Sequence, residues 1–101
     1  MWKLQILSAE LKILTQPSNV TCANGATATF TVEAQGDTLK YQWYSSADGG
    51  ATWTASYLTG YNTDTFSFAV NASRAARLYK CVITDVGGNT VETDYVAVTI
   101  G

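Results

Sequence analysis

The sequence contains no histidine, a single proline and two cysteines. Without an imidazole, no serine or cysteine of the chain has the usual base that activates it as a nucleophile, and a metal site loses its commonest ligand. The acidic residues are spread singly, whereas a glycosidase needs two facing carboxyls and a calcium site needs several converging oxygens. Solvated charge is preferred over a weak cation site of Glu92 and Asp94 with Asp37 or Asp85. We therefore expect no catalytic residue, no cofactor, no metal and no enzymatic activity.

Charge is also scarce. Charged residues make up 14% of the chain, against about 25% in an average domain, and the net charge is -2. This composition provides no basic field for phosphates, so nucleic acid is not an expected partner. The longest apolar runs are only a few residues, far short of the ~20 that a membrane helix needs, so no membrane insertion is expected. A hydroxyl-rich, charge-poor surface is typical of exported β domains and predicts an extracellular or cell-surface location.

The chain begins like a signal peptide, but Gln5, Ser8 and Glu10 interrupt the apolar core that such a peptide needs. Residues 1–10 are therefore interpreted as an N-terminal extension or linker, with any export signal elsewhere. The remaining residues, 11–101, fit one domain, because about 100 residues is a common size for a single hydrophobic core. A hydrophobic fraction of 47% is ample to fill that core.

What the chain does have is a regular alternation of large and polar side chains. In residues 39–44, Leu39, Tyr41 and Trp43 share one face of an extended backbone. The other face takes Lys40, Gln42 and Tyr44. This stretch is predicted to be the central strand, with Trp43 in the middle of the core.

Comparable stretches recur along the chain, separated by turn-forming clusters about every ten residues. The last stretch changes parity between Val91 and Val96, which requires an extra residue and predicts a bulge near Thr93 and Asp94. Residues 71–77 are expected to form at most a short helical turn. Seven or more short strands predict an all-β sandwich or barrel. The predicted strands cover residues 11–15, 19–22, 26–35, 39–44, 51–54, 63–70, 78–85 and 91–100.

Several local signatures follow one another in a characteristic order. They are Pro17 before a kink, Gly25 at a turn, Tyr41-Gln42-Trp43 in one strand, the hairpin formers Asp48-Gly49-Gly50, Tyr79-Lys80-Cys81 in a later strand, and a closing hairpin from Thr84 and Asp85 to Ile100. Together they resemble a bacterial immunoglobulin-like (Ig-like) repeat domain of Gram-positive surface and secreted proteins. The resemblance implies an all-β, Ig-like β-sandwich of two antiparallel sheets, with seven to nine strands and Greek-key connections.

The resemblance also assigns roles to core residues. Trp43 matches the buried tryptophan of strand C, and Tyr79 matches the tyrosine corner, whose hydroxyl bonds to the upstream backbone. The strand B cysteine of antibody-like domains falls on Val32, which implies a contact between Val32 and Cys81 in place of a disulfide. Ala75 replaces the acidic residue that usually precedes strand F. Both departures suit a bacterial repeat better than a vertebrate receptor.

The two cysteines are Cys22 and Cys81, and an even number is common in disulfide-bonded exported domains. Their positions along the predicted strands differ by about 13 Å, whereas a bridge needs Cα atoms within about 7 Å. Two buried free thiols are the preferred interpretation, and a bridge of non-standard placement is the alternative.

Residues 46–53 fit the pattern Ser-x-Asp-x-Gly-x-Thr-Trp of the Asp-box, which recurs in sialidase propellers and other β proteins. The pattern is specific for a hairpin, because Asp48 can accept bonds from turn amides and the glycines can take positive φ. Trp53 is expected to cover the turn, and a contact with sugar is its alternative role.

The favoured functional hypothesis is a non-catalytic Ig-like module of a bacterial cell-surface or secreted protein, a spacer or adhesion unit whose partners are neighbouring domains of the same chain. The alternative is a module that binds carbohydrate or a host protein through exposed aromatics on the sheet of strands C, F and G. Parity places Tyr44 and Val82 on the outward face of that sheet, where they form an exposed apolar patch unless Trp53 or Tyr57 folds over them. These four residues are the candidate ligand contacts.

Overall fold

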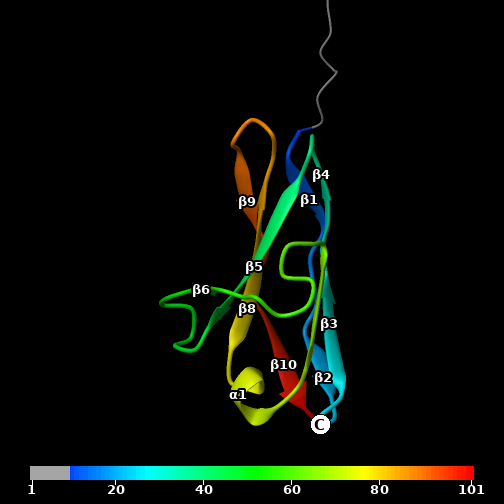
Figure 1. Ribbon diagram of the computed structural model, residues 1–101, viewed down its shortest axis with the longest axis vertical. Helices are drawn as coiled ribbons and strands as arrows, with labels where there is room; N and C mark the ends of the chain where they lie inside the picture. Colours follow the sequence, from blue (N-terminus) through cyan, green and yellow to red (C-terminus); the bar gives the residue numbers. More distant parts are fainter. Residues whose placement is uncertain (1–9) are drawn as a thin grey trace, which may run out of the picture.

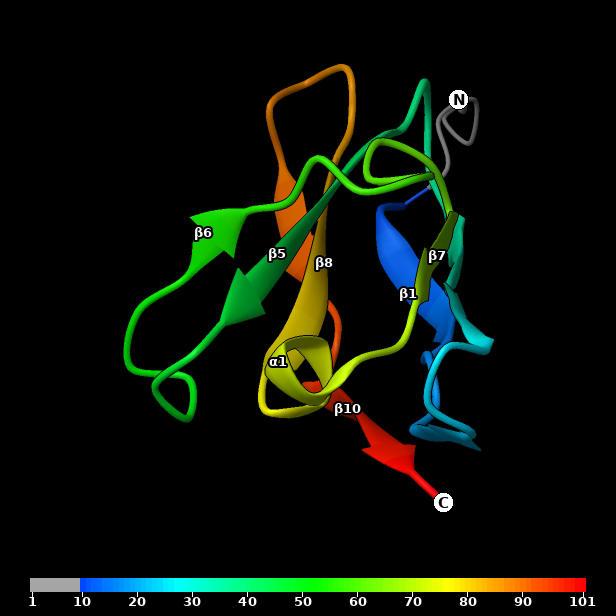
Figure 2. The same ribbon diagram turned by 60° about the horizontal axis from the view of Figure 1, so that its bottom comes forward.

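The computed structural model describes residues 10–101, whose strands lie in two facing layers (Figures 1 and 2). Most of the expected N-terminal extension, residues 1–9, lies outside the described residues. No helix within residues 10–101 has the length and apolar character that crossing a membrane requires. The elements are β1 (Lys12–Thr15), β2 (Val20–Cys22), β3 (Thr27–Thr31), β4 (Glu33–Gln35), β5 (Lys40–Ser46), β6 (Thr54–Ala55), β7 (Thr65–Ala69), α1 (Ala72–Ala75), β8 (Leu78–Thr84), β9 (Thr90–Glu92) and β10 (Val96–Ile100).

The first layer contains β1, β3, β4 and β7. β1 pairs antiparallel with β4, and β3 pairs antiparallel with β7. β3 and β4 are consecutive parts of one strand, interrupted at Val32, whose amide donates to the carbonyl of Asp64 (3.0 Å). The threonines of β3 are exposed while Ala28 and Phe30 are buried, as its alternating sequence requires.

The second layer has the order β2, β10, β8, β5 and β6, with β9 also paired to β8. Its centre is a long antiparallel ladder between β5 and β8, from Lys40 opposite Thr84 to Ser46 opposite Leu78. β2 runs parallel to β10 at one edge. The chain leaves the first layer and enters the second between β1 and β2. Buried Pro17 lies at this crossing, and because it has no backbone N–H it cannot donate a hydrogen bond to a neighbouring strand.

The strand segments of residues 10–101 amount to seven strands, because three strands are each divided in two. The divisions fall at Pro17 between β1 and β2, at Val32 between β3 and β4, and between β9 and β10. In the lettering of Ig domains, β5 is strand C, β8 is strand F, and β9 with β10 is strand G. The predicted all-β, Ig-like sandwich is confirmed, with a strand number inside the predicted range.

The last strand contains the predicted bulge. Val82 of β8 lies opposite Glu92, and Tyr79 of β8 lies opposite Val96, so three steps along β8 match four along the last strand. Thr93 fills this irregularity: its amide donates to the carbonyl of Cys81 and its hydroxyl accepts from the amide of Cys81, both at 2.9 Å. Thr93 is buried, and its amide and hydroxyl both bond to the backbone of Cys81 in β8, which explains how a polar residue occupies this position.

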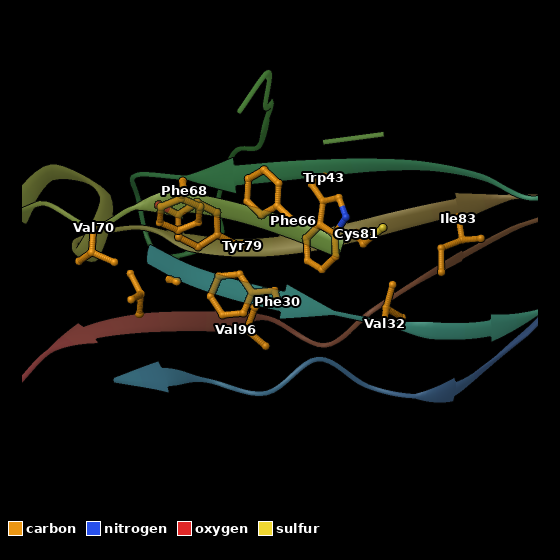
Figure 3. Packing of buried hydrophobic residues seen from close by; sticks show 12 residues of the cluster. Phe30, Val32, Trp43, Phe66, Phe68, Val70, Tyr79, Cys81, Ile83 and Val96 are labelled. Atoms are coloured by element: carbon orange, nitrogen blue, oxygen red, sulfur yellow. The ribbon is translucent and has the colours of Figure 1, made fainter. Parts of the chain in front are cut away.

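The core between the layers is centred on Trp43 of β5, which is fully buried (Figure 3). Its ring stacks on Phe66 with centroids 5.1 Å apart and lies 6.3 Å from Phe30, so it contacts aromatic rings from β7 and β3 of the opposite layer. The indole Nε1 donates to the carbonyl of Thr63 (2.7 Å), which satisfies the polar atom of the ring. The buried cluster consists of Ala28, Phe30, Val32, Trp43, Phe66, Phe68, Val70, Tyr79, Cys81, Ile83, Val96 and Val98.

The irregular segment between β6 and β7 spans the open side of the sandwich. The amide of Ser56 donates to the carbonyl of Trp43 (2.9 Å), and the amide of Trp43 donates to the carbonyl of Tyr61 (2.8 Å). The same segment reaches the other layer, where the amide of Ser67 on β7 donates to the carbonyl of Thr59 (3.0 Å). This segment therefore connects β5 to β7 through hydrogen bonds without forming a strand of its own.

Tyr79 of β8 forms the expected tyrosine corner. Its ring is buried, 5.0 Å from the ring of Phe68, and its hydroxyl donates to the carbonyl of Arg74 at 2.7 Å. Arg74 lies in α1, and Asn71 caps that helix by accepting a hydrogen bond from the amide of Arg74 (2.8 Å). The core ring and the cap together fix the connection from β7 to β8.

Both cysteines lie in the described part of the chain, and neither forms a disulfide. Cys81 is buried opposite Trp43 in the ladder, in the same core cluster as Val32. Burial raises the pKa of the Cys81 thiol to about 12. Cys22 lies opposite Ile100 at the edge and is half-buried, so the expectation that both thiols are buried is wrong for Cys22.

We expect Trp43→Ala to lower the free energy of unfolding by about 3–5 kcal/mol, because it removes the largest side chain of the core. Trp53→Ala is the matched control. Because Trp53 is only half-buried, its replacement should lower the free energy of unfolding by less. Urea denaturation curves of both variants measure the difference. A larger loss for Trp53→Ala would contradict the placement of Trp43 at the centre of the fold.

In the folded chain at mildly alkaline pH, a thiol reagent should modify Cys22 much faster than Cys81. The reason is that burial both shields Cys81 and keeps its thiol protonated. After unfolding in denaturant without reductant, two thiols per chain should react. Quantitative thiol titration measures both states, and an unfolded chain without reactive thiols would demonstrate a disulfide instead.

Candidate functional site

The outer sheet face is the surface of β5 and β8 that points away from the core. It consists of Gln42, Tyr44, Lys80, Val82 and Thr84, all of which are half-buried. Gln42 lies opposite Val82, and Tyr44 lies opposite Lys80, so parity placed these side chains on the correct side of the sheet. Tyr44 and Val82, which the sequence placed in an exposed patch unless Trp53 or Tyr57 folds over them, are both half-buried.

Trp53 lies over this face. The Nζ atom of Lys80 is 4.7 Å from the centroid of the Trp53 ring, and the ring of Tyr95 is 4.8 Å from it at an angle of 55°. Lys80 also forms an ion pair with Glu92 (2.7 Å), and only 13% of its side chain is exposed. Lys80 lies directly opposite Tyr44, so Trp53 contacts the face at the position next to Tyr44. The contact of Trp53 with Lys80 agrees with the alternative in which Trp53 folds over the face.

The Asp-box hairpin, residues 46–53, holds Trp53 in this position. The Asp48 carboxylate accepts hydrogen bonds from the Thr52 hydroxyl (2.5 Å), the Thr52 amide (2.9 Å) and the Ser46 hydroxyl (2.7 Å). These bonds, those from Thr52 first, lower the pKa of Asp48 to about 2. The Ser46 hydroxyl in turn accepts from the amide of Gly50 (2.8 Å). The hairpin is therefore a closed hydrogen-bonded unit whose carboxylate stays ionised at neutral pH.

The hairpin is longer, and the return strand shorter, than predicted. The expected strand over residues 51–54 is reduced to β6, in which Thr54 lies opposite Ser45, because the residues before it belong to the hairpin. Gly50 has φ +99°, and a Cβ atom there would lie 3.1 Å from the ring of Tyr95. Trp53 and Tyr95 therefore both lie against the turn.

Tyr95 is a further candidate contact residue, which the sequence did not single out. It is 53% exposed and adjoins Trp53, so the two rings form a partly open aromatic pair. Tyr95 stands between β9 and β10, at the bulge, where the alternation of neither strand predicts its direction. Its only sequence signal was the predicted bulge itself.

Tyr57, the fourth candidate contact, lies apart from this pair. It is 80% exposed, its ring contacts Tyr61 edge-on with centroids 5.4 Å apart, and it lines a groove beside α1. The four residues that the sequence grouped as ligand contacts are thus divided between the outer sheet face and this groove.

Within residues 10–101, no group of three or more acidic, cysteine or histidine side chains is placed to hold a metal ion. Asp85 is occupied in its own turn, where it accepts from the side chain and amide of Asn89 and from the amide of Gly87, and these bonds lower its pKa. Glu92 is paired with Lys80.

The fold resembles solved Ig domains. A chain of the crystal structure of the titin M10 and obscurin-like 1 Ig complex has a TM-score of 0.60 and 18% identity, over 90% of this chain and 93% of that chain. The D1 domain of Duf (Kirre) has a TM-score of 0.64 and 10% identity, over 91% and 97% of the two chains. Extracellular domains 3–5 of Drosophila OTK have a TM-score of 0.60 and 17% identity, over 89% of this chain and 34% of that chain.

At these identities the similarity concerns the fold alone, and the chain spans about one third of the OTK structure. No curated protein sequence matches the chain. The family described as a domain of unknown function (DUF8696) matches residues 12–101, which include every strand of the sandwich from β1 to β10. The chain therefore belongs to the DUF8696 family.

Proposed function

We propose that the chain is a non-catalytic Ig-like module of a bacterial cell-surface or secreted protein, where it acts as a spacer and adhesion unit. The observation that carries this proposal is the position of the chain ends. The first described residues and the C-terminus lie at opposite ends of the long axis (Figure 1). Neighbouring domains of the same chain would then join end to end, with residues 1–10 as the extension or linker on one side. The sequence resemblance to bacterial Ig-like repeats supports the bacterial, extracellular assignment.

The chemistry of the described residues supports a non-catalytic role. Cys81, the side chain with the most strongly raised pKa, is buried and protonated, so it is not a nucleophile. Asp48 is bound within its hairpin, which explains its low pKa as a structural feature. A spacer needs a core that resists deformation between its ends, and Trp43 with its aromatic neighbours supplies one.

The proposal predicts the shape of two modules in tandem. We expect two copies of the full sequence, fused end to end, to form an extended particle whose maximum dimension approaches twice that of one copy. Small-angle X-ray scattering of the tandem and the single module measures both. A compact tandem with the two copies side by side would contradict the role as a spacer.

A second candidate function rests on the Trp53 and Tyr95 pair. Tyr95 is half-exposed beside Trp53 on the sheet of strands C, F and G, which makes the pair a platform for carbohydrate or for a host protein. The Ig domains of the titin and obscurin-like 1 structure are themselves in a protein complex. With such a platform, the module would adhere by binding a specific ligand.

If this second function holds, a screen of glycans and host matrix proteins should yield a ligand whose binding is lost in Tyr95→Ser. Leu14→Ser is the matched control, because Leu14 is an equally exposed apolar residue on β1 in the other layer. Equal binding by Tyr95→Ser and the unmodified chain would contradict the proposal that the aromatic pair binds the ligand.

A further inference from the structure

A groove of about 430 Å³ lies between the end of β5 with β6 and the segment around α1. Its walls come from Ser45, from residues 54–58 and from parts of residues 71–79. The volume falls within the usual range of small-ligand sites, about 300–1,000 Å³. The groove is separate from the outer sheet face, and the tandem-spacer role makes no use of it.

Two arginines line the groove, and no acidic side chain does. The Nη1 atom of Arg74 donates to the carbonyl of Ala69 (2.8 Å), and its guanidinium lies 5.9 Å from the ring centroid of Phe68, so its position is fixed. Within residues 10–101 the one ion pair is that of Lys80 with Glu92, which leaves the charge of Arg77 without a carboxylate partner there. Both arginine residues are half-buried.

Tyr79 lines the groove together with Arg74 and Arg77. Burial raises the pKa of Tyr79, and the positive charges of Arg77 and Arg74 partly offset this increase. The hydroxyl itself is held by its bond to the carbonyl of Arg74. The two arginines, with no acidic side chain in the lining, give the groove a positive charge in a chain whose net charge is -2.

The rest of the lining offers contacts of another kind. Tyr57 presents an 80% exposed ring that Tyr61 supports edge-on, and the hydroxyl residues Thr54, Ser56 and Ser73 lie along the groove. A guanidinium fork matches the geometry of a carboxylate, and an aromatic ring can pack against the apolar face of a sugar.

We propose that the groove binds a carboxylated sugar. Arg74 and Arg77 hold the carboxylate, the ring of Tyr57 contacts the apolar face of the sugar ring, and the neighbouring hydroxyls bond the sugar hydroxyl groups. An acidic peptide also carries carboxylates. The lining has only two aliphatic side chains, Ala55 and Leu58, and is otherwise rich in hydroxyls, which favours a ligand that is itself covered with hydroxyl groups.

The test titrates the full chain with sialyllactose and a hyaluronan tetrasaccharide as carboxylated probes, and with lactose and maltotetraose as neutral ones. We expect saturable binding of at least one carboxylated probe and none of the neutral probes. Arg77→Gln should weaken that binding by about tenfold or more, because a charge-assisted pair is lost. Arg77→Lys should weaken it less, since it keeps the charge and loses the planar fork. Tyr57→Ser should also weaken it, by about threefold or more.

Lys12→Gln is the matched control, because it removes the same charge from exposed Lys12 on β1 in the other layer. Its affinity should be unchanged, and a loss equal to that of Arg77→Gln would overturn the site. Equal binding of the neutral probes would overturn the role of the arginines. Binding of tetraglutamate without any carboxylated sugar would overturn the sugar assignment, and no binding of any probe would overturn the whole proposal.

Thermal melts verify that each variant is folded. If Arg77→Gln does not fold, the two single variants Arg77→Lys and Tyr57→Ser still test the site, because each is expected to weaken binding. The outcome is independent of the spacer role, because scattering by the tandem reports the alignment of modules and not the occupancy of the groove. It is also distinct from the second candidate function, which depends on Tyr95.

Discussion

The packing of Trp43 is the interaction on which the rest of the structure depends. Its ring contacts Phe66 and Phe30 of the opposite layer, which holds the two layers face to face. Its indole nitrogen and its backbone are bonded to the irregular segment that crosses from β5 to β7, through Thr63 and Tyr61. One residue therefore fixes the spacing of the layers, the position of the central strand and the course of the crossing segment. A smaller side chain would leave both a cavity and unsatisfied polar groups.

Tyr79 extends the same core to the surface. Its ring belongs to the aromatic cluster, and its hydroxyl holds the carbonyl of Arg74, so the short turn around α1 has a defined position although its helix is only four residues long. A helix of that length is not stable by its own hydrogen bonds. The arginines of the groove thus owe their placement to a buried tyrosine, which couples the proposed ligand site to the packing of the core.

On the opposite side of the sheet, local hydrogen bonds fix the position of the Asp-box hairpin, as Tyr79 fixes the turn around α1. The carboxylate of Asp48 closes the Asp-box hairpin through Ser46 and Thr52, and the hairpin then carries Trp53 onto Lys80 and Tyr95. Trp53 contacts the outer sheet face at Lys80 for this reason. The hairpin motif therefore shapes the surface available to a partner, in addition to forming a turn.

Alternation along the chain determined the strands, the inward direction of Trp43 and Tyr79, and the bulge that contains Thr93, because a strand buried on one face records that burial in its sequence with a period of two. Alternation predicts the side of the sheet to which a residue points, but it does not predict which other segment packs against that residue. The contact of Trp53 with Lys80 on the outer sheet face, and the groove that both Tyr57 and Arg77 line, bring together residues from separate segments. Only the tertiary structure decided these, since long-range contacts depend on the path of the loops between strands.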